Sequence, residues 1–438
     1  MAMTYLIKHG FLVDPVAGRY GEYDLIIKEG KVIAVGKDLA GEGQEVIDAH
    51  NLLVMPGLID LHVHLREPGQ EEKETIATGS RAAAKGGFTS ITAMPNTIPS
   101  ADNASVITFV KTKSKEEGVV RVYPVGNITK GGAGQELAEL ADLVEAGAVA
   151  FSDDGASILN AAVERYAFQY GKLFNKPFLL HCEDKNLTAD GVMHEGTVST
   201  KLGLKGIPAL AEEVIIARDL LLAEETGARI HLCHLSTKRS LDLFKEAKAR
   251  GVQVTAEVTP HHLTLTDQEV LGYNPATKVS PPLRPLHDVE ALQEALIEGT
   301  IDLIATDHAP HTREEKHQEY SLAPFGMTGL ETALGVVLTK FYHTGKLSLE
   351  RIVQLMSVKP AQVLKIPGGT LKEGSPADLI MVDLNIEWEV REEDFISKGK
   401  NSPFIGKKLK GRNLATMVEG KWVYKSPQAP FNGVEKKF

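Results

Sequence analysis

The chain has 438 residues, of which 43% are hydrophobic and 24% are charged, and its formal net charge is −10. This acidic balance argues against a general affinity for nucleic acid or for an anionic membrane surface, and no apolar run is long enough to span a membrane. The two cysteines, Cys182 and Cys233, are too few for a disulfide framework and suit a reducing cytoplasm, and the first residues lack the pattern of a signal peptide.

The first 55 residues or so are predicted to form β-structure. YDLIIKEGKVIAVG, residues 23–36, places two apolar runs around a Glu-Gly turn, which indicates a hairpin. QEVIDAHNLLVMPG, residues 44–57, predicts a second pair of strands.

Short β-rich runs then alternate with helical stretches up to about residue 310. Helices such as TIATGSRAAAKGG and LAEEVIIARDLLLAEETG are each closed by glycine. Eight β–α units at a mean spacing of about 35 residues favour a closed (β/α)₈ barrel. A doubly wound sheet is the alternative, but no Gly-rich dinucleotide fingerprint follows the first strand. The eight runs are LIDLHVH (58–64), TSITAMPN (89–96), RVYPVGN (121–127), AVAFSDD (148–154), PFLLHCE (177–183), RIHLCHL (229–235), QVTAEVTP (253–260) and DLIATDHA (302–309).

The end of the chain returns to β-structure. ADLIMVDLN, residues 377–385, and LATMVEGKWVY, residues 414–424, are predicted strands and hairpins. REEKHQEY, residues 313–320, is a charged loop after the eighth run, and SPFIGKKLKGRN, residues 402–413, is predicted to be a surface connection.

Polar residues stand where the predicted barrel strands end, which is where barrel enzymes place their active sites. In the first run, VMPGLIDLHVHLREPG, His62 and His64 are two residues apart and would project side by side from a strand. The strand-end residues are His62, His64, Asn96, Asn127, Asp154, His181, His234, Thr259 with His261, and Asp307.

Four histidines and two aspartates in this group suit a pair of zinc ions and would also tolerate manganese or cobalt. Two such ions about 3.5–4 Å apart can hold a bridging hydroxide at neutral pH. We expect His62 and His64 to hold one ion, and His181 and His234 to hold the other.

The aspartates would complete this site. Asp154 could bridge the ions, although Asp153 competes for that role because strand alternation lets only one of the two point inward. Asp307 could touch the first ion and handle protons. His231, His261, His262 and His308 are expected to support the site, and alternation turns Cys182 and Cys233 away from it to act as packing residues.

An anion pocket is expected beside the metals. Arg66 follows His64 in the first loop, and its guanidinium suits bidentate binding of a carboxylate. Asn96 could donate to the same anion, and His311 lies on the eighth loop.

The motifs together resemble a known family. PGLIDLHVHLREPG and ATDHAPH resemble the first and last motifs of the amidohydrolase superfamily, and with TAMPNT, AFSDDG, LLHCED, HLCHLS, TPHHL and APFGMTGLETALG they are similar to the bacterial type I dihydroorotases. The resemblance covers residues 4–425 or so. It implies a distorted (β/α)₈ barrel over residues 56–365, with a small β-sandwich built from residues 1–55 and 366–438.

The resemblance also assigns residues. It implies that the metal ligands are His62, His64, Asp154, His181, His234 and Asp307, with Asp307 catalytic. It implies that the substrate contacts are His64, Arg66, Asn96, Ser280, His311, Phe325 and Gly326.

Two departures from related patterns stand out. AVAFSDDG contains no lysine, so Asp154 takes the place of the carboxylated lysine that bridges the metals in many superfamily members. KVSPPLR has Ser280 where the family often has asparagine, which leaves the role of that position open.

The implied activity is the reversible, zinc-dependent cyclisation of N-carbamoyl-L-aspartate to L-dihydroorotate and water, the third step of pyrimidine (UMP) biosynthesis. In the hydrolytic direction a bridging hydroxide would attack the ring amide, with Asp307 as general base and then general acid. The resemblance suggests a cytoplasmic homodimer and allows association with aspartate transcarbamoylase. The alternatives are another cyclic amidohydrolase, such as a dihydropyrimidinase, hydantoinase or allantoinase, and an inactive partner of aspartate transcarbamoylase.

Overall fold

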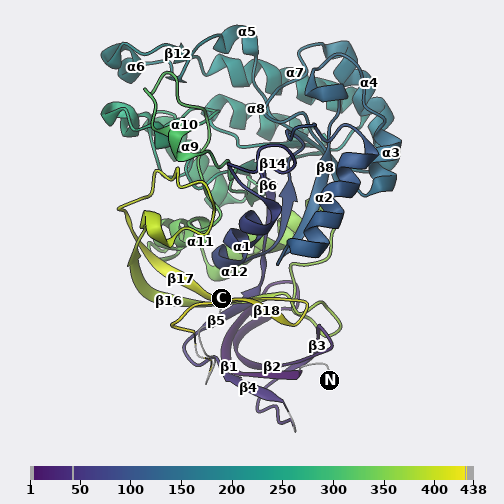
Figure 1. Cartoon of the computed structure of the whole chain (residues 1–438), viewed down its shortest axis with the longest axis vertical. Coiled ribbons are helices and arrows are strands. Elements are labelled where there is room, and N and C mark those ends of the chain that lie inside the picture. Colours follow the sequence, from purple (N-terminus) through teal and green to yellow (C-terminus); the bar gives the residue numbers. More distant parts are fainter. Residues whose placement is uncertain (1–3, 42–43, 430, 432–438) are drawn as a thin grey trace.

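The computed structural model describes residues 4–41, 44–429 and 431. These residues form a barrel surrounded by helices and a separate sheet that lies below it in Figure 1. No helix in the described ranges is long and apolar enough to cross a membrane.

The barrel strands match the eight predicted runs. Within the described part of the chain, eight parallel strands follow one another in the order β6-β7-β8-β9-β10-β13-β14-β15. A parallel bridge between Val63 and His308 brings the last strand back to the first and closes the barrel. The strands are β6 (Leu58–Val63), β7 (Phe88–Ala93), β8 (Arg121–Gly126), β9 (Ala150–Phe151), β10 (Phe178–Leu180), β13 (Ile230–Leu232), β14 (Val254–Val258) and β15 (Leu303–Ile304).

Helices lie between these strands and around the barrel. They are α1 (Ile76–Gly86), α2 (Ala104–Glu117), α3 (Leu140–Ala146), α4 (Ala161–Gly171), α5 (Lys185–Thr188), α6 (Thr197–Leu202), α7 (Leu210–Thr226), α8 (Lys238–Ala249), α9 (Leu286–Glu298), α10 (Arg313–Lys316), α11 (Ala333–Val337), α12 (Leu349–Val353) and α13 (Lys359–Leu364). Single-turn 3₁₀ or π segments are η1 (Lys130–Gly132), η2 (Lys172–Phe174), η3 (Asp267–Gly272), η4 (Pro275–Thr277), η5 (Leu338–Tyr342), η6 (Gln354–Val358) and η7 (Glu392–Asp394). A two-stranded ladder pairs β11 (Met193–His194) with β12 (Gly206–Ile207).

Both helices predicted to close at glycine do so. Thr75 caps α1, since its hydroxyl accepts from the Thr78 amide, and Gly87 ends the helix in the left-handed conformation at φ 94°. Gly227 ends α7 in the same way at φ 67°. These ends fix where the chain turns back into β7 and β13.

The two ends of the chain form one sheet. Its order is β18-β17-β16-β5-β1-β2-β3, with β4 also paired to β1. The expected pairing between the two strands of residues 44–57 is wrong, because β4 and β5 both pair in parallel with β1 rather than with each other. The strands are β1 (Thr4–Asp14), β2 (Arg19–Lys28), β3 (Lys31–Gly36), β4 (Glu45–Asp48), β5 (Leu53–Pro56), β16 (Leu379–Glu389), β17 (Lys408–Val418) and β18 (Lys421–Lys425).

The sheet curls so that distant strands meet across it. Lys31 forms a bridge with Pro376, and the rings of Tyr5 and Trp422 lie 6.0 Å apart although three other strands separate β18, which carries Trp422, from β1. Alternate side chains face opposite ways. Ile380 joins the large core shared with the barrel helices, whereas its neighbour Met381 joins a second core enclosed by the sheet.

A single residue, Gly57, joins β5 of the sheet to β6 of the barrel. Its amide donates to Asp378 O, and its carbonyl accepts from Ser357 Oγ. A Cβ at this position would lie 2.1 Å from Thr89 Cγ2, so only glycine fits the close approach of the two strands.

The prediction that residues 402–413 form a surface connection is wrong for most of that stretch. Ser402 and Phe404 are only 2% and 4% exposed, and β17 begins at Lys408. The segment before β17 packs against the barrel loops instead. We propose the domain limits 1–55 and 366–438 for the sheet and 56–365 for the barrel, with this segment of the sheet unit reaching across to the barrel.

Candidate active site

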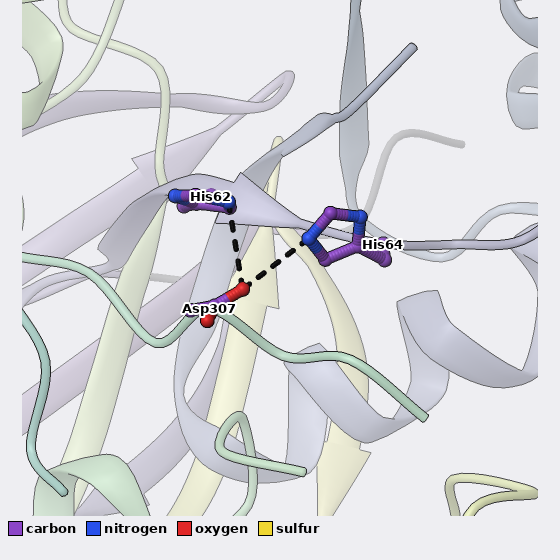
Figure 2. A group of neighbouring side chains, drawn as sticks. All are labelled: His62, His64 and Asp307. Atoms are coloured by element: carbon purple, nitrogen blue, oxygen red, sulfur yellow. Dashed lines mark hydrogen bonds and ion pairs between the residues drawn. The ribbon is translucent and has the colours of Figure 1, made fainter. Parts of the chain in front are cut away.

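His62, His64 and Asp307 meet at the carboxyl end of the barrel (Figure 2). His62 lies on β6 and His64 directly after it, while Asp307 follows β15. Asp307 Oδ1 is 3.2 Å from His64 Nε2 and 3.5 Å from His62 Nε2. The bridge that closes the barrel therefore brings the first and last motifs of the sequence together.

Asp154, three residues after the last residue of β9, lies between the histidines. Its Oδ1 is 3.3 Å from His62 Nε2, and its Oδ2 is 3.4 Å from His64 Nε2. Oδ1 is also 3.5 Å from His181 Nδ1 and 3.9 Å from His234 Nε2. One carboxylate thus faces both pairs of histidines.

The second pair is equally close. His181 Nδ1 and His234 Nε2 lie 3.0 Å apart. All six residues expected to hold metal are therefore brought into one buried cluster.

Three imidazoles are held from behind by protein groups. His62 Nδ1 lies 2.8 Å from Glu257, His64 Nδ1 lies 2.9 Å from Asn96 and His181 Nε2 lies 3.1 Å from Glu183, so the other ring nitrogen of each is the one that faces the cluster. Among the described residues, His62 Nε2 and Asp154 Oδ1 are buried without a hydrogen-bond partner. Converging nitrogen lone pairs and carboxylate oxygens form a donor set that fits a divalent cation.

The electrostatics of the cluster also favour a cation. Burial opposes a charge on His62, yet Asp154 and Asp307 raise its pKa well above the usual value. Burial likewise opposes ionisation of Asp307, but His62 and His64 hold its pKa below the ordinary range. Burial opposes ionisation of Asp154 too, but His62 and His181 hold its pKa well below the usual value, so both carboxylates stay ionised and attract positive charge.

Asp153 has a different environment from Asp154. It accepts from the amides of Ile128 and Thr129 and from Asn127 Nδ2, away from the histidines. Asn127, one of the strand-end residues, thus binds Asp153 rather than the cluster.

The supporting histidines mostly bind other protein groups. His231 Nε2 donates to Glu257, His262 Nε2 donates to Pro281 O, and His308 Nδ1 accepts from the Gly329 amide. Among the described residues, His261 Nε2 is buried and has no partner.

Sequence reasoning missed Glu257, a carboxylate in the middle of β14. It accepts from His62 Nδ1 at 2.8 Å and from His231 Nε2 at 3.0 Å. Burial raises its pKa, but the two histidines outweigh this and lower it to about 2. A glutamate inside the apolar run VTAEV was the available signal.

Glu183 was missed as well. Its carboxylate accepts from His181 Nε2 at 3.1 Å and also binds Lys185. Burial opposes ionisation, but His181 and Lys185 bring the pKa down to about 2.

The two cysteines differ. Cys182 contacts Leu180 O and Asp219, away from the cluster as expected. Cys233 packs in a buried apolar cluster, as expected, and its sulfur also lies within 4.8 Å of a His62 ring nitrogen and a Glu257 oxygen. Both thiols are free and buried.

Three residues of this site have left-handed backbones. The φ angles are 63° at Arg66, 36° at His234 and 48° at Asp307. Such angles are costly for residues other than glycine and tend to gather at functional sites.

Arg66 and His311 lie together beside the cluster. Arg66 Nε donates to Pro310 O at 3.2 Å, and its Nη2 is 3.4 Å from His311 Nε2. His311 Nε2 donates to Phe325 O at 2.8 Å. Burial and the charge of Arg66 lower the pKa of His311 to about 3, so Arg66 supplies the positive charge of this corner.

A cavity of about 230 Å³ joins this corner to the cluster. Every residue expected to contact substrate lines it: His64, Arg66, Asn96, Ser280, His311, Phe325 and Gly326. Glu183 and Lys185 line it too.

The chain is similar to curated dihydroorotases along nearly its whole length. It is 58% identical to the dihydroorotase of Pelotomaculum thermopropionicum over 421 residues, which cover 96% of this chain and 98% of that protein. It is 49% identical to the dihydroorotase of a Thermoanaerobacter species, over 97% of this chain and 98% of the relative. The chain belongs to the dihydroorotase family. Residues 51–240 also match the family described as dihydro-orotase-like.

Solved structures extend the likeness of this dihydroorotase family member to hydantoinases. The L-hydantoinase of Arthrobacter aurescens superposes with a TM-score of 0.88 at 30% identity, covering 98% of this chain and 97% of that one. The barrel with a separate terminal sheet is thus the amidohydrolase architecture, and the chain is a metal-dependent enzyme of the cyclic amidohydrolase class.

Proposed function

We propose that the chain catalyses the reversible cyclisation of N-carbamoyl-L-aspartate to L-dihydroorotate and water, the third step of pyrimidine biosynthesis. One observation carries this proposal beyond family membership. Arg66, a buried cation in the corner next to the His/Asp cluster, lines the same cavity as five of the expected metal ligands. Such a corner suits a substrate with a carboxylate beside the amide that reacts.

We further propose that two zinc ions bind in the cluster. His62, His64 and Asp307 would hold one, and His181 and His234 would hold the other, with Asp154 shared between them. When bound, the metals lower the pKa of water and polarise a carbonyl group, which is the chemistry that amide hydrolysis needs. Glu257, Asn96 and Glu183 would fix the tautomers of the histidine ligands.

Asp307 is the proposed proton carrier. In ring opening it would take the proton of the attacking water and deliver it to the ring nitrogen that leaves; cyclisation reverses these transfers. Its low pKa supports the first role, since the carboxylate starts the reaction ionised.

The other cavity residues would hold the ring. Arg66, Asn96 and His311 would bind the carboxylate of dihydroorotate, and the backbone of Phe325 and Gly326 would bind the ring amide. Asn96 Oδ1 is already used by His64, which leaves its Nδ2 to donate to the anion. Ser280 would contact the substrate with a shorter reach than the asparagine common in the family.

Hydantoinase, dihydropyrimidinase or allantoinase activity is the rival assignment, because hydantoinases share the fold. Their substrates carry no carboxylate on the ring, so the buried charge of Arg66 would have no partner. A role as an inactive partner of aspartate transcarbamoylase would not require all six expected metal ligands to be present.

The test is ring opening of L-dihydroorotate, followed by loss of ultraviolet absorbance, with dihydrouracil, hydantoin and allantoin in parallel. The protein is assayed as purified, after removal of metal by a chelator, and after return of zinc. Turnover of dihydroorotate alone, lost on chelation and regained with zinc, is the expected result. Turnover of an uncharged ring would refute the proposed substrate but not the proposed metal site. Inactivity toward all four rings with zinc bound would overturn the proposal.

We also propose a cytoplasmic homodimer that can associate with aspartate transcarbamoylase. The free, buried cysteines are compatible with a reducing compartment. Light scattering of the purified, active protein tests the stoichiometry, and the same measurement with added aspartate transcarbamoylase tests the association; an unchanged mass in the mixture would contradict it.

A further inference from the structure

The segment of residues 397–401, from the part of the chain that otherwise builds the terminal sheet, packs against the loop that follows β15. Ser397 Oγ donates to Glu74, which also binds His308. At Gly399 a Cβ would lie 2.5 Å from Pro310 Cβ, so the absence of a side chain lets the two backbones touch.

Asn401 ends this segment with three hydrogen bonds to two different loops. Its Oδ1 accepts from the His311 amide at 3.1 Å. Its Nδ2 donates to Ala309 O at 3.0 Å and to Gly326 O at 3.1 Å. The side chain is 6% exposed, so these bonds are shielded from water.

Each of the bonded backbone groups belongs to the carboxylate corner of the cavity. Between Ala309 and His311 lies Pro310, whose carbonyl fixes Arg66 Nε. Next to Gly326 lies Phe325, whose carbonyl accepts from the His311 ring. One buried amide therefore sets the spacing of the groups that surround the expected anion.

We propose that Asn401 is a positioning residue for recognition of the substrate carboxylate. It lines no part of the cavity next to the metals and acts through Arg66, His311 and the Phe325–Gly326 backbone. The inference rests on the proposed function and adds that the terminal-sheet part of the chain sets substrate affinity at a barrel site.

Asparagine suits this position because one planar group supplies an acceptor and two donors. Alanine would leave the His311 amide and the Ala309 carbonyl without these partners, and would leave Gly326 O with the bond from Lys316 Nζ alone. Aspartate would keep the acceptor but turn an anionic oxygen toward two carbonyl oxygens. Either change should let the two loops move apart, which affects the anion more than the reacting amide.

The test is Asn401→Ala in the full-length, zinc-loaded protein. We expect KM for L-dihydroorotate to rise about tenfold, the size of one lost hydrogen bond to a charged group, while kcat changes much less. The matched control is Asn413→Ala, because Asn413 is also 6% exposed and its Nδ2 also donates to two backbone carbonyls, those of Ala84 and Lys85. This control should lose similar thermal stability and keep the KM of the parent.

A second measurement separates positioning from general loosening. Since Asn401 acts partly through His311, the double variant Asn401→Ala with His311→Ala should raise KM less than the product of the two single effects. Inhibition by orotate, a carboxylated ring, should weaken in Asn401→Ala, whereas any inhibition by uracil should not. If the alanine variant fails to fold, Asn401→Ser is measured in the same way.

An unchanged KM in a folded Asn401 variant, or an equal rise in the Asn413 control, would overturn the inference. The inference would also be overturned if KM in the double variant rose by the full product of the two single effects. A parent protein that does not turn over dihydroorotate would instead refute the proposed function, so the two failures are distinguishable.

Discussion

Asp307 combines two proposed tasks, since it faces both histidines of β6 and is the proposed proton carrier. Asp307→Asn keeps the size of the side chain but removes the proton acceptor. We expect kcat for dihydroorotate ring opening to fall by about 10²–10⁴, with little change in thermal unfolding temperature.

Metal content decides how that loss is interpreted. Zinc measured by elemental analysis separates loss of proton transfer from loss of the ion. A variant with near-normal turnover would remove Asp307 from the mechanism.

Arg66 is the cation of the carboxylate corner. Arg66→Ala should raise KM for dihydroorotate by about tenfold or more, because a charge-assisted contact is lost, and steady-state kinetics will measure it. Arg66→Lys is the control that keeps the charge without the planar fork, and we expect only partial recovery. An alanine variant with the parental KM would contradict the anion pocket.

The site residues that stand at the ends of the barrel strands could be predicted from the sequence. His62, His64 and Asp307 stand at the ends of apolar runs, and barrel geometry gathers such ends. Glu257 was not predictable as the partner of His62, because 195 residues separate them and only the closed barrel brings them together. Asn401 was missed for the same reason, since its partners lie 75 to 92 residues away.

Among the elements, β14 supplies side chains that bind the histidines of the site, although its sequence is mostly apolar. Thr255 and Glu257 alternate with buried apolar residues, and both bind His231. Glu257 alone of the two also binds His62.

Glu257→Gln should therefore weaken zinc binding by about 10–100-fold, because the charge that orients His62 is lost. Competition with a chromophoric chelator measures the affinity. Thr255→Val is the control on the same strand, since it removes a hydrogen bond to His231 without touching His62. Equal zinc affinity in both variants would show that Glu257 serves packing only.

The positions of the strands and helices were predicted correctly, because the local sequence pattern determines them. The partners of β4 and β5 were not, because strand pairing depends on distant parts of the chain. All eight barrel strands follow from apolar runs and glycine-closed helices. The pairing of β4 and β5 with β1 depends on contacts between residues 40 to 42 positions apart, which alternation alone does not specify. The buried path around Phe404 was missed because its lysines and glycines resemble those of an exposed loop.

At the scale of the whole molecule, the sheet and the barrel share one core. Leu53 and Ile380 of the sheet belong to the same buried cluster as Phe88 and Leu58 of the barrel. Such continuity predicts that the two parts unfold together.

The two tryptophans can test this. Both stand on strands of the sheet. Trp422 of β18 contacts Tyr5 within the sheet, whereas Trp388 of β16 lies under Arg412 and packs against α11 of the barrel, so it reports the contact between the two parts. The variants Trp388→Phe and Trp422→Phe each keep one tryptophan and are unfolded in urea. In each variant, the unfolding curve from tryptophan fluorescence should coincide with the curve from far-ultraviolet circular dichroism. Separate transitions by the two probes would show that the contact between the sheet and the barrel is lost independently of the interior of the sheet.

Gly57 has a consequence for how substrate enters. A one-residue connection whose amide and carbonyl are both hydrogen-bonded, held against Thr89, leaves no hinge between the sheet and the barrel. We therefore expect the enzyme to admit its substrate without any rotation of one part against the other. Binding of the substrate and release of the product would depend instead on short movements of the loops at the rim of the cavity.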